Sequence, residues 1–231
     1  MIPKIKLLNV ETYAFANKAS FLDYIKDKKK ILVAINAEKI LKDDRRLYQI
    51  INQNIGYPDG IGAVMALKQK GLDAVKIPGS EFWLDIIHEF HDKKRFYLLG
   101  STQEVIKNTV KKLKKEFPNI NIVGYRDGFL KDDDKQRLKE SLIALKPDIV
   151  FVAQGSPRQE FLMAELLEIH PALYMGLGGS FDIYGGDKKR APKLFLDLHL
   201  EWLYRLLKEP TRIHRQLILV KFILWLKMKK L

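Results

Sequence analysis

Short apolar runs alternate with stretches of helical periodicity along most of the chain. The runs of strand length are residues 31–37, 74–77, 96–99, 120–123, 149–153 and 172–177. Helical periodicity follows them at residues 39–53, 81–91, 103–116, 133–145 and 158–169. Continuously apolar strands that alternate with helices are typical of a parallel sheet covered on both faces. The sequence therefore predicts an α/β fold with a Rossmann-like, largely parallel sheet.

Small and polar residues follow the predicted strands. These segments are Asn36–Glu38, Pro58–Gly62 after a short strand at 55–57, Gly100–Thr102, Gln154–Glu160 and Gly176–Asp182. In a parallel sheet, ligands bind beyond the carboxyl ends of the strands, and helix N-termini there favour phosphate. The pattern predicts a phosphate-binding crevice along one edge of the sheet.

Asp59 lies between Pro58 and Gly60 at the end of a predicted strand. A carboxylate exposed at this turn could act as a general base toward a sugar hydroxyl. The alternative is that Asp59 only caps the helix that begins near Gly60, which is the commoner use of aspartate at such a junction.

Two glycine-containing segments are candidates for binding a nucleotide. In the first, Gly155 and Ser156 precede a helix start at Pro157, and we expect Gln159 and Glu160 to reach outward to a ribose or base. The alternative is an ordinary helix capped by Ser156. In the second, Gly178 and Gly179 precede Ser180, and this segment could equally be a plain turn.

The composition argues against a metal site or a cofactor. The chain has no cysteine and five histidines, so a thiolate zinc site and a disulfide are excluded. Asp132, Asp133 and Asp134 resemble an acidic metal motif, but they precede a helical stretch whose N-terminus favours negative charge. We expect this triplet to be structural.

Positive charge is concentrated near the C-terminus. Residues 188–231 hold twelve Lys and Arg against three acidic residues, a net charge of +9 out of +13 for the whole chain. The apolar run Leu217–Leu226 is too short to span a bilayer, which needs about 20 residues. Lysines flank this run, which favours a helix that lies in an anionic membrane surface. A helix packed on the core or on a second subunit is the alternative, and no nucleic-acid motif accompanies the charge.

Three arginines in this region could bind a diphosphate. Arg205, Arg212 and Arg215 would share one helical face if Pro210 only kinks or restarts the helix, and arginine binds phosphate bidentately. We expect a core domain at residues 1–190 and a basic helical appendage at 191–231. The N-terminus lacks the apolar run of a signal peptide, which predicts a cytoplasmic protein on the inner face of the membrane.

Several stretches together resemble the bacterial WecG/TagA/CpsF glycosyltransferase family, in collinear order from about Ile31 to the C-terminus. The matching residues are Ile35–Lys39, Tyr57–Gly60, Gly155–Glu160, Ala172–Gly176, Gly178–Gly179, Lys189–Lys193, Leu200–Leu207, Pro210, Arg212 and Arg215–Leu217. The likeness is strongest to members that add N-acetyl-D-mannosaminuronic acid in enterobacterial common antigen synthesis.

The resemblance implies an inverting, metal-independent transfer from a UDP-sugar to undecaprenyl-pyrophosphoryl-N-acetylglucosamine at the membrane. It implies that Asp59 is the catalytic base, that Asn36 contacts the donor sugar and that Gln154 lies in the nucleotide pocket. It also implies that Arg205, Arg212 and Arg215 bind the lipid pyrophosphate.

The sequence leaves two alternatives open. One keeps the acceptor but uses UDP-N-acetylmannosamine or a UDP-hexose as donor. A uronic acid donor would need a cation beside its carboxylate, for which Lys39, Arg126 and Arg158 are candidates. The other alternative is a basic membrane-binding or nucleic-acid-binding module without turnover, which would not bind UDP.

Overall fold

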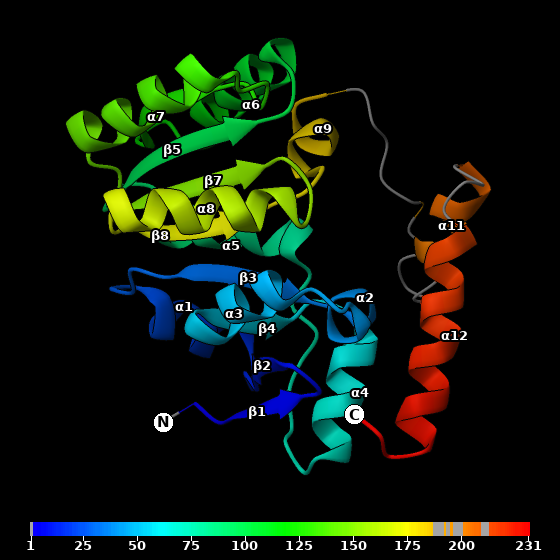
Figure 1. The fold of residues 1–231 in the computed structure, drawn as a ribbon. Helices are drawn as coiled ribbons and strands as arrows, with labels where there is room; N and C mark the ends of the chain where they lie inside the picture. Colours follow the sequence, from blue (N-terminus) through cyan, green and yellow to red (C-terminus); the bar gives the residue numbers. More distant parts are fainter. Residues whose placement is uncertain (1, 187–191, 193–194, 196–200, 209–212) are drawn as a thin grey trace.

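The computed structural model describes residues 2–186, 192, 195, 201–208 and 213–231. Its centre is a sheet of six parallel strands in the order β4-β3-β8-β7-β5-β6 (Figure 1). The strands are Ile31–Ile35 (β3), Ile55–Pro58 (β4), Arg95–Gly100 (β5), Asn121–Arg126 (β6), Ile149–Ala153 (β7) and Leu173–Gly176 (β8). This arrangement confirms the predicted α/β fold.

Helices cover both faces of this sheet. Successive strand residues pack on opposite faces, so Val33 and Leu32 belong to different apolar clusters. One face is covered by α3 (Arg45–Gln53), α4 (Ile61–Gln69), α7 (Asp132–Leu145) and α8 (Arg158–Ile169). The other is covered by α1 (Lys18–Ile25), α5 (Gly79–Phe90) and α6 (Gln103–Glu116). Burial on both faces explains why the strands are continuously apolar in sequence.

The helix predicted at 39–53 is two helices, α2 (Ala37–Leu41) and α3. The chain leaves helical geometry at Lys42, and Asp44 starts α3 by accepting a hydrogen bond from the Leu47 amide at 2.9 Å. This cap gives one of the first-turn amides of α3 a hydrogen-bond partner. The apolar periodicity therefore runs on through residues 39–53, although the chain is not helical between α2 and α3.

The strand predicted at residues 74–77 is absent, because this segment is an extended connection to α5. The Val75 amide donates to the Phe15 carbonyl and the Ile77 amide to the Pro58 carbonyl. These are isolated bonds to two different segments and do not form a ladder. The short apolar run at 74–77 is compatible with either a strand or a buried connection, so the sequence pattern could not distinguish the two.

The first thirty residues add a hairpin that the sequence did not predict. Strands β1 (Lys4–Leu7) and β2 (Val10–Tyr13) pair antiparallel, and β2 packs across β4. Gly56 of β4 makes this contact possible, because a Cβ there would lie 2.4 Å from the Glu11 carbonyl oxygen. The hairpin therefore covers the edge strand of the sheet.

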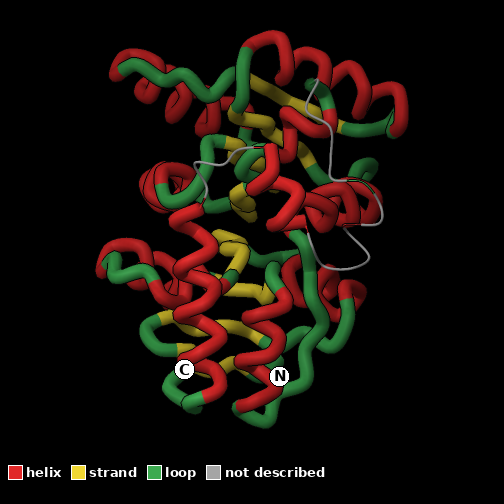
Figure 2. Tube along the Cα trace, turned by 90° about the vertical axis from the view of Figure 1, so that its right-hand side faces the viewer, coloured by secondary structure: helices red, strands yellow, loops and turns green. Residues whose placement is uncertain are grey.

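The C-terminal helix α12 (Ile213–Lys227) packs on α2 and α4 (Figure 2). Phe222, Leu226 and the terminal Leu231 are buried in the same cluster as the sheet. The Gln69 side chain donates to the Leu226 carbonyl at 2.8 Å. The division at residue 190 stays a prediction, but α12 contributes apolar side chains to the core of the protein.

The carboxyl ends of the strands point to one side of the molecule, toward α2, α9 (Ser180–Tyr184) and the C-terminal helices (Figure 1). At the neighbouring strands β5 and β7 the chain continues in opposite directions, through α6 on one face and α8 on the other. In open α/β sheets the ligand crevice lies at such a reversal, beyond the carboxyl ends of the strands. The candidate residues of the sequence lie along this edge.

Candidate active site

Asp59 directly follows β4, and its backbone amide donates to the Ile35 carbonyl of β3 at 3.0 Å. Asp59 is not the cap of the helix that follows, because α4 begins at Ile61 with Gly60 as its N-cap and has no side-chain cap hydrogen bond. The carboxylate instead accepts a 2.6 Å hydrogen bond from the Gly79 amide, at the start of α5. The amide and the N-terminal end of α5 stabilise a negative charge at this position. The structure thus fixes a half-buried carboxylate at the crevice edge.

Gly79 is required for this contact. A Cβ at Gly79 would lie 2.6 Å from the Tyr57 hydroxyl oxygen and 3.5 Å from Asp59 Oδ1. Sequence reasoning missed Gly79, although Pro78-Gly79-Ser80 directly precedes a predicted helix and is a pattern typical of a turn.

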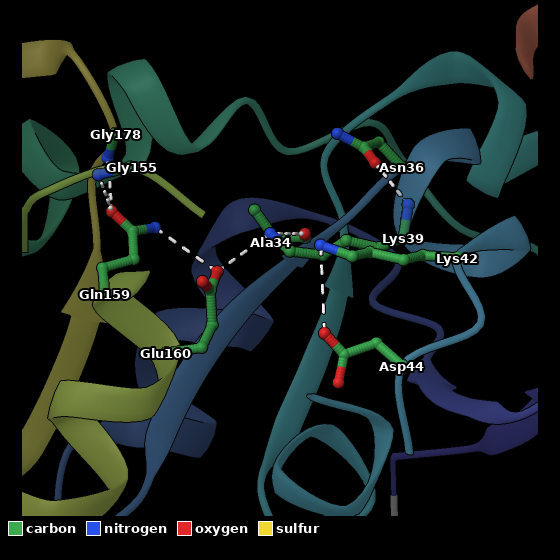
Figure 3. A network of polar contacts seen from close by, with 9 residues as sticks. All are labelled: Ala34, Asn36, Lys39, Lys42, Asp44, Gly155, Gln159, Glu160 and Gly178. Carbon is green, nitrogen blue, oxygen red and sulfur yellow. Dashed lines mark hydrogen bonds and ion pairs between the residues drawn. The ribbon is translucent and has the colours of Figure 1, made fainter. Parts of the chain in front are cut away.

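Asn36 lies beside Asp59, at the end of the neighbouring strand β3. A Cβ at Gly60 would be 3.5 Å from the Asn36 Cβ, which places Asn36 against the turn after Asp59. Asn36 Oδ1 caps α2 by accepting from the Lys39 amide at 3.0 Å. Figure 3 shows the carboxamide nitrogen directed away from this bond. The Asn36 NH₂ group is therefore the part of this side chain that can donate to a ligand.

Gln154 follows β7, and its side chain contacts the segment that follows β6. Its side-chain nitrogen donates to the Gly128 carbonyl at 2.6 Å, and the Gly128 amide donates to the Ser101 carbonyl at 2.9 Å. The Ser101 amide in turn donates to the Ala153 carbonyl at 3.1 Å. These bonds connect the segments that follow β5, β6 and β7, at the reversal point where a nucleotide is expected.

Gly155 and Gly178 both have the left-handed backbone geometry that glycine favours, with φ values of +78° and +58°. Ser156 is exposed, and α8 begins after Pro157 without a side-chain cap, so the alternative role of Ser156 as a cap is absent. Gly179 precedes the short helix α9. The two glycine segments follow the adjacent strands β7 and β8, so they lie side by side at the crevice.

Gln159 and Glu160 do not reach outward, contrary to the expectation from sequence. They are 4% and 1% exposed, respectively. Gln159 Oε1 accepts from the Gly155 amide at 3.1 Å and from the Gly178 amide at 2.9 Å (Figure 3). Gln159 therefore holds the two glycine segments together, because the apolar face of α8 that packs on the sheet begins at its first turn.

Glu160 pairs with Lys39, whose Nζ lies 3.0 Å from Glu160 Oε1. Lys39 Nζ also donates to the Ala34 carbonyl of β3 at 3.0 Å. The buried Tyr57 hydroxyl lies in the same region. Burial raises the pKa of Tyr57 well above its ordinary value, and the carboxylates of Asp59 and Glu160 raise it further. Tyr57 therefore stays an uncharged phenol beside two carboxylates.

The arginine cluster is only partly within the described chain. Arg205 lies on α11 (Glu201–Lys208) and Arg215 on α12, while Arg212 lies outside the described residues. Arg205 and Arg215 thus lie on two described helices, and the segment between these helices, which contains Pro210, lies outside the described residues. Binding of pyrophosphate by these arginines stays a prediction.

The acidic triplet Asp132–Asp134 forms the first turn of α7, as expected. Asp134 accepts a hydrogen bond from the Lys131 amide at 3.1 Å, and this bond lowers the Asp134 pKa, with a contribution from Arg126. Within the described residues, no group of three or more His, Asp or Glu side chains is placed to hold a metal ion.

A parallel α/β sheet with a carboxylate and glycine segments at its carboxyl edge is typical of nucleotide-binding α/β proteins. Residues 5–231 match the model of the glycosyl transferase WecG/TagA/CpsF family, and the chain belongs to this family. It is therefore a glycosyltransferase of surface polysaccharide synthesis that uses a nucleotide-sugar donor and a lipid-linked acceptor. The match includes the N-terminal hairpin, beyond the resemblance that begins near Ile31.

Proposed function

We propose that the chain transfers N-acetyl-D-mannosaminuronic acid from UDP to undecaprenyl-pyrophosphoryl-N-acetylglucosamine, with inversion, in enterobacterial common antigen synthesis. The observation that supports this most is the Asp59 carboxylate, held by the Gly79 amide beside Asn36 at the crevice edge. A membrane-bound acceptor also agrees with the +9 charge of the last 44 residues.

In the proposed reaction, Asp59 takes the proton of the acceptor hydroxyl as its oxygen attacks the anomeric carbon of the donor sugar. The new glycosidic bond forms as the bond between the anomeric carbon and the UDP oxygen breaks. The electron pair of that bond leaves with UDP. A single displacement of this kind inverts the anomeric centre, and a base near the acceptor hydroxyl is the group it requires.

A transfer assay with purified undecaprenyl-pyrophosphoryl-N-acetylglucosamine and a panel of UDP-sugars tests this proposal. We expect transfer from the N-acetylmannosaminuronic acid donor. Transfer only from UDP-N-acetylmannosamine or a UDP-hexose would correct the donor and keep the acceptor. The absence of any UDP-induced thermal shift would contradict nucleotide-sugar binding and favour a non-catalytic binding module.

The three cations that could bind the donor carboxylate differ in their contacts. Lys39 is paired with Glu160, and Arg126 lies 3.4 Å from Asp134. Arg158 is exposed at the first residue of α8, three residues after Gly155, and makes no ion pair with another described residue. We therefore propose Arg158 as the residue that recognises a uronic acid donor.

We expect Arg158→Ala to raise KM for the uronic acid donor by about tenfold or more, since a hydrogen bond to a charged group contributes ~1.5–3 kcal/mol. KM for the neutral UDP-N-acetylmannosamine should change little. Steady-state kinetics with both donors measure this, and Arg158→Lys serves as the charge-preserving control. An equal effect on both donors would refute the specificity role.

We also expect EDTA to leave the transfer rate unchanged. The sequence reasoning assigns the acidic triplet to a helix start, and its contacts in α7 agree with that role. The measurement is the transfer rate before and after chelation. A loss that Mg²⁺ or Mn²⁺ restores would show that the reaction requires a metal.

Association with an anionic membrane surface is proposed for the face of α12 that is turned away from the core. Its exposed apolar residues are Leu217, Val220, Ile223, Leu224 and, just past the helix, Met228. Lys221 and Lys227 lie on the same side at the helical repeat of 100° per residue. No helix in the described ranges has both the length and the apolar character to span a bilayer. An apolar stripe flanked by lysines suits the interface between headgroups and acyl chains.

A further inference from the structure

The Lys39–Glu160 ion pair differs from every other ion pair among the described residues, because both side chains are buried. The side chains are 9% and 1% exposed, whereas the next most buried pair, Arg126–Asp134, is 21% and 25% exposed. Burying two charges costs hydration free energy that their attraction often does not recover. A contribution to stability therefore does not explain the presence of this buried ion pair.

This pair is also incompletely satisfied. Within the described structure, Glu160 Oε2 and the nearby Tyr57 hydroxyl are buried without a hydrogen-bond partner. A network that served stability alone would satisfy these groups or replace them by apolar side chains. The other contacts of Lys39 and Glu160 indicate what the pair does.

Each partner of the pair contacts a different part of the crevice. Lys39 belongs to the half with the catalytic candidates, because its own amide binds Asn36 Oδ1 and its ammonium binds the β3 carbonyl of Ala34. Glu160 belongs to the half with the glycine segments, because its Oε1 accepts from Gln159 Nε2 at 3.4 Å. Figure 3 shows this chain of contacts running from Asn36 to Gly155 and Gly178.

Gln159 has little freedom to adopt another position. Gly176 of β8 lies against it, and a Cβ at Gly176 would be 2.3 Å from Gln159 Nε2. With Nε2 directed at Glu160, Oε1 is directed at the amides of Gly155 and Gly178. The Gln159 carboxamide is thus held between Glu160, which is paired with Lys39, and the two glycine amides.

We propose that Lys39 and Glu160 are positioning residues that hold the two glycine segments, through Gln159, at a fixed place relative to Asn36 and Asp59. The nucleotide as the ligand of those segments rests on the proposed function. The positioning itself is a property of the protein without ligand and can be measured without it.

The decisive variant is Lys39→Met combined with Glu160→Met. Replacing a buried ion pair by apolar side chains of similar volume is often neutral or stabilising, so we expect the melting temperature to stay near that of the wild type. Hydrogen exchange of the Gly155 and Gly178 amides should accelerate about tenfold, because Gln159 loses the acceptor that orients it. Amides of the β7 interior should exchange as in the wild type.

The matched control is Glu165→Gln on the same helix. Glu165 forms an exposed ion pair with Arg46 at 3.4 Å, and exposed pairs contribute little. We expect no change in the exchange of either glycine amide. Unchanged exchange at Gly155 and Gly178 in the double variant would overturn the proposal. Failure of that variant to fold would also overturn it, since the pair would then serve folding itself.

UDP titration of the same proteins by calorimetry separates this proposal from the proposed function. If the wild type binds UDP, the double variant should bind about tenfold more weakly, while Glu165→Gln should bind normally. If the wild type does not bind UDP, the proposed function fails, and the exchange rates alone decide on the positioning role. The double variant could also show faster exchange of the glycine amides together with normal UDP affinity. The Lys39–Glu160 pair would then order only the ligand-free crevice, and its role in placing the nucleotide site would be overturned.

Discussion

Asp59→Asn is expected to lower kcat by ~10²–10⁴-fold while leaving the affinity for UDP almost unchanged, because loss of a general base has this effect on rate. Asparagine has nearly the same volume, and its oxygen can still accept the hydrogen bond from the Gly79 amide. The change therefore removes the proton acceptor and keeps the local geometry. The transfer assay gives kcat, and calorimetry gives the UDP affinity.

Asp85→Asn is the matched control for this variant. Asp85 lies on α5, six residues after Gly79, and forms a 2.6 Å ion pair with Lys18 on the side of α5 that packs near α1. We expect its kcat to equal that of the wild type. If Asp59→Asn kept more than about a third of the wild-type rate, the general-base role would be excluded, since that loss is far below the usual effect.

The second large effect is expected at the exposed face of α12. The triple change Leu217→Gln, Val220→Gln, Leu224→Gln should weaken binding to anionic vesicles by at least about 100-fold, because burying each of these side chains contributes ~1.5–3 kcal/mol. Glutamine is a good helix former, so α12 should remain folded. Vesicle flotation measures the binding, and transfer to the lipid acceptor should fall with it.

Phe222→Ala is the control on the opposite side of the same helix. Phe222 is buried against Gly62 of α4. Its truncation should lower the free energy of unfolding by ~3–5 kcal/mol and leave vesicle binding by the folded protein intact. Normal flotation of the triple variant would contradict the membrane role and favour a helix face covered by a second protein chain.

The packing of α12 changes what removal of the appendage should do. The sequence alone predicts a core domain at residues 1–190 and a separate basic appendage at 191–231. Phe222, Leu226 and Leu231 are buried in the core cluster, so a deletion would expose the surfaces of α2 and α4 beneath them. Point changes on the exposed face therefore test membrane binding more cleanly than a truncation.

The periodicity of the sequence determined the main elements of the sheet and helices. The helix predicted at 103–116 is α6 with the same bounds, and the strand predicted at 149–153 is β7. Both are long or continuously apolar segments, in which burial repeats with a clear period. The strand predicted at 74–77 is wrong, although the equally short run at 96–99 lies in β5 and that at 120–123 overlaps β6. An apolar run does not show whether a hydrogen-bonded partner strand exists.

The sequence also determined which segments lie at the carboxyl edge of the sheet, since it placed Asn36, Asp59, Gln154 and Gly178 after strands. Only the tertiary structure decided what these residues contact. Asp59 binds the amide of Gly79, and Glu160 binds Lys39 across 121 positions of the chain. The local sequence pattern indicates which residues are buried. The partner of a buried charge depends instead on which strands become neighbours in the sheet. That order, β3 beside β8 and β8 beside β7, is fixed by packing of the whole sheet.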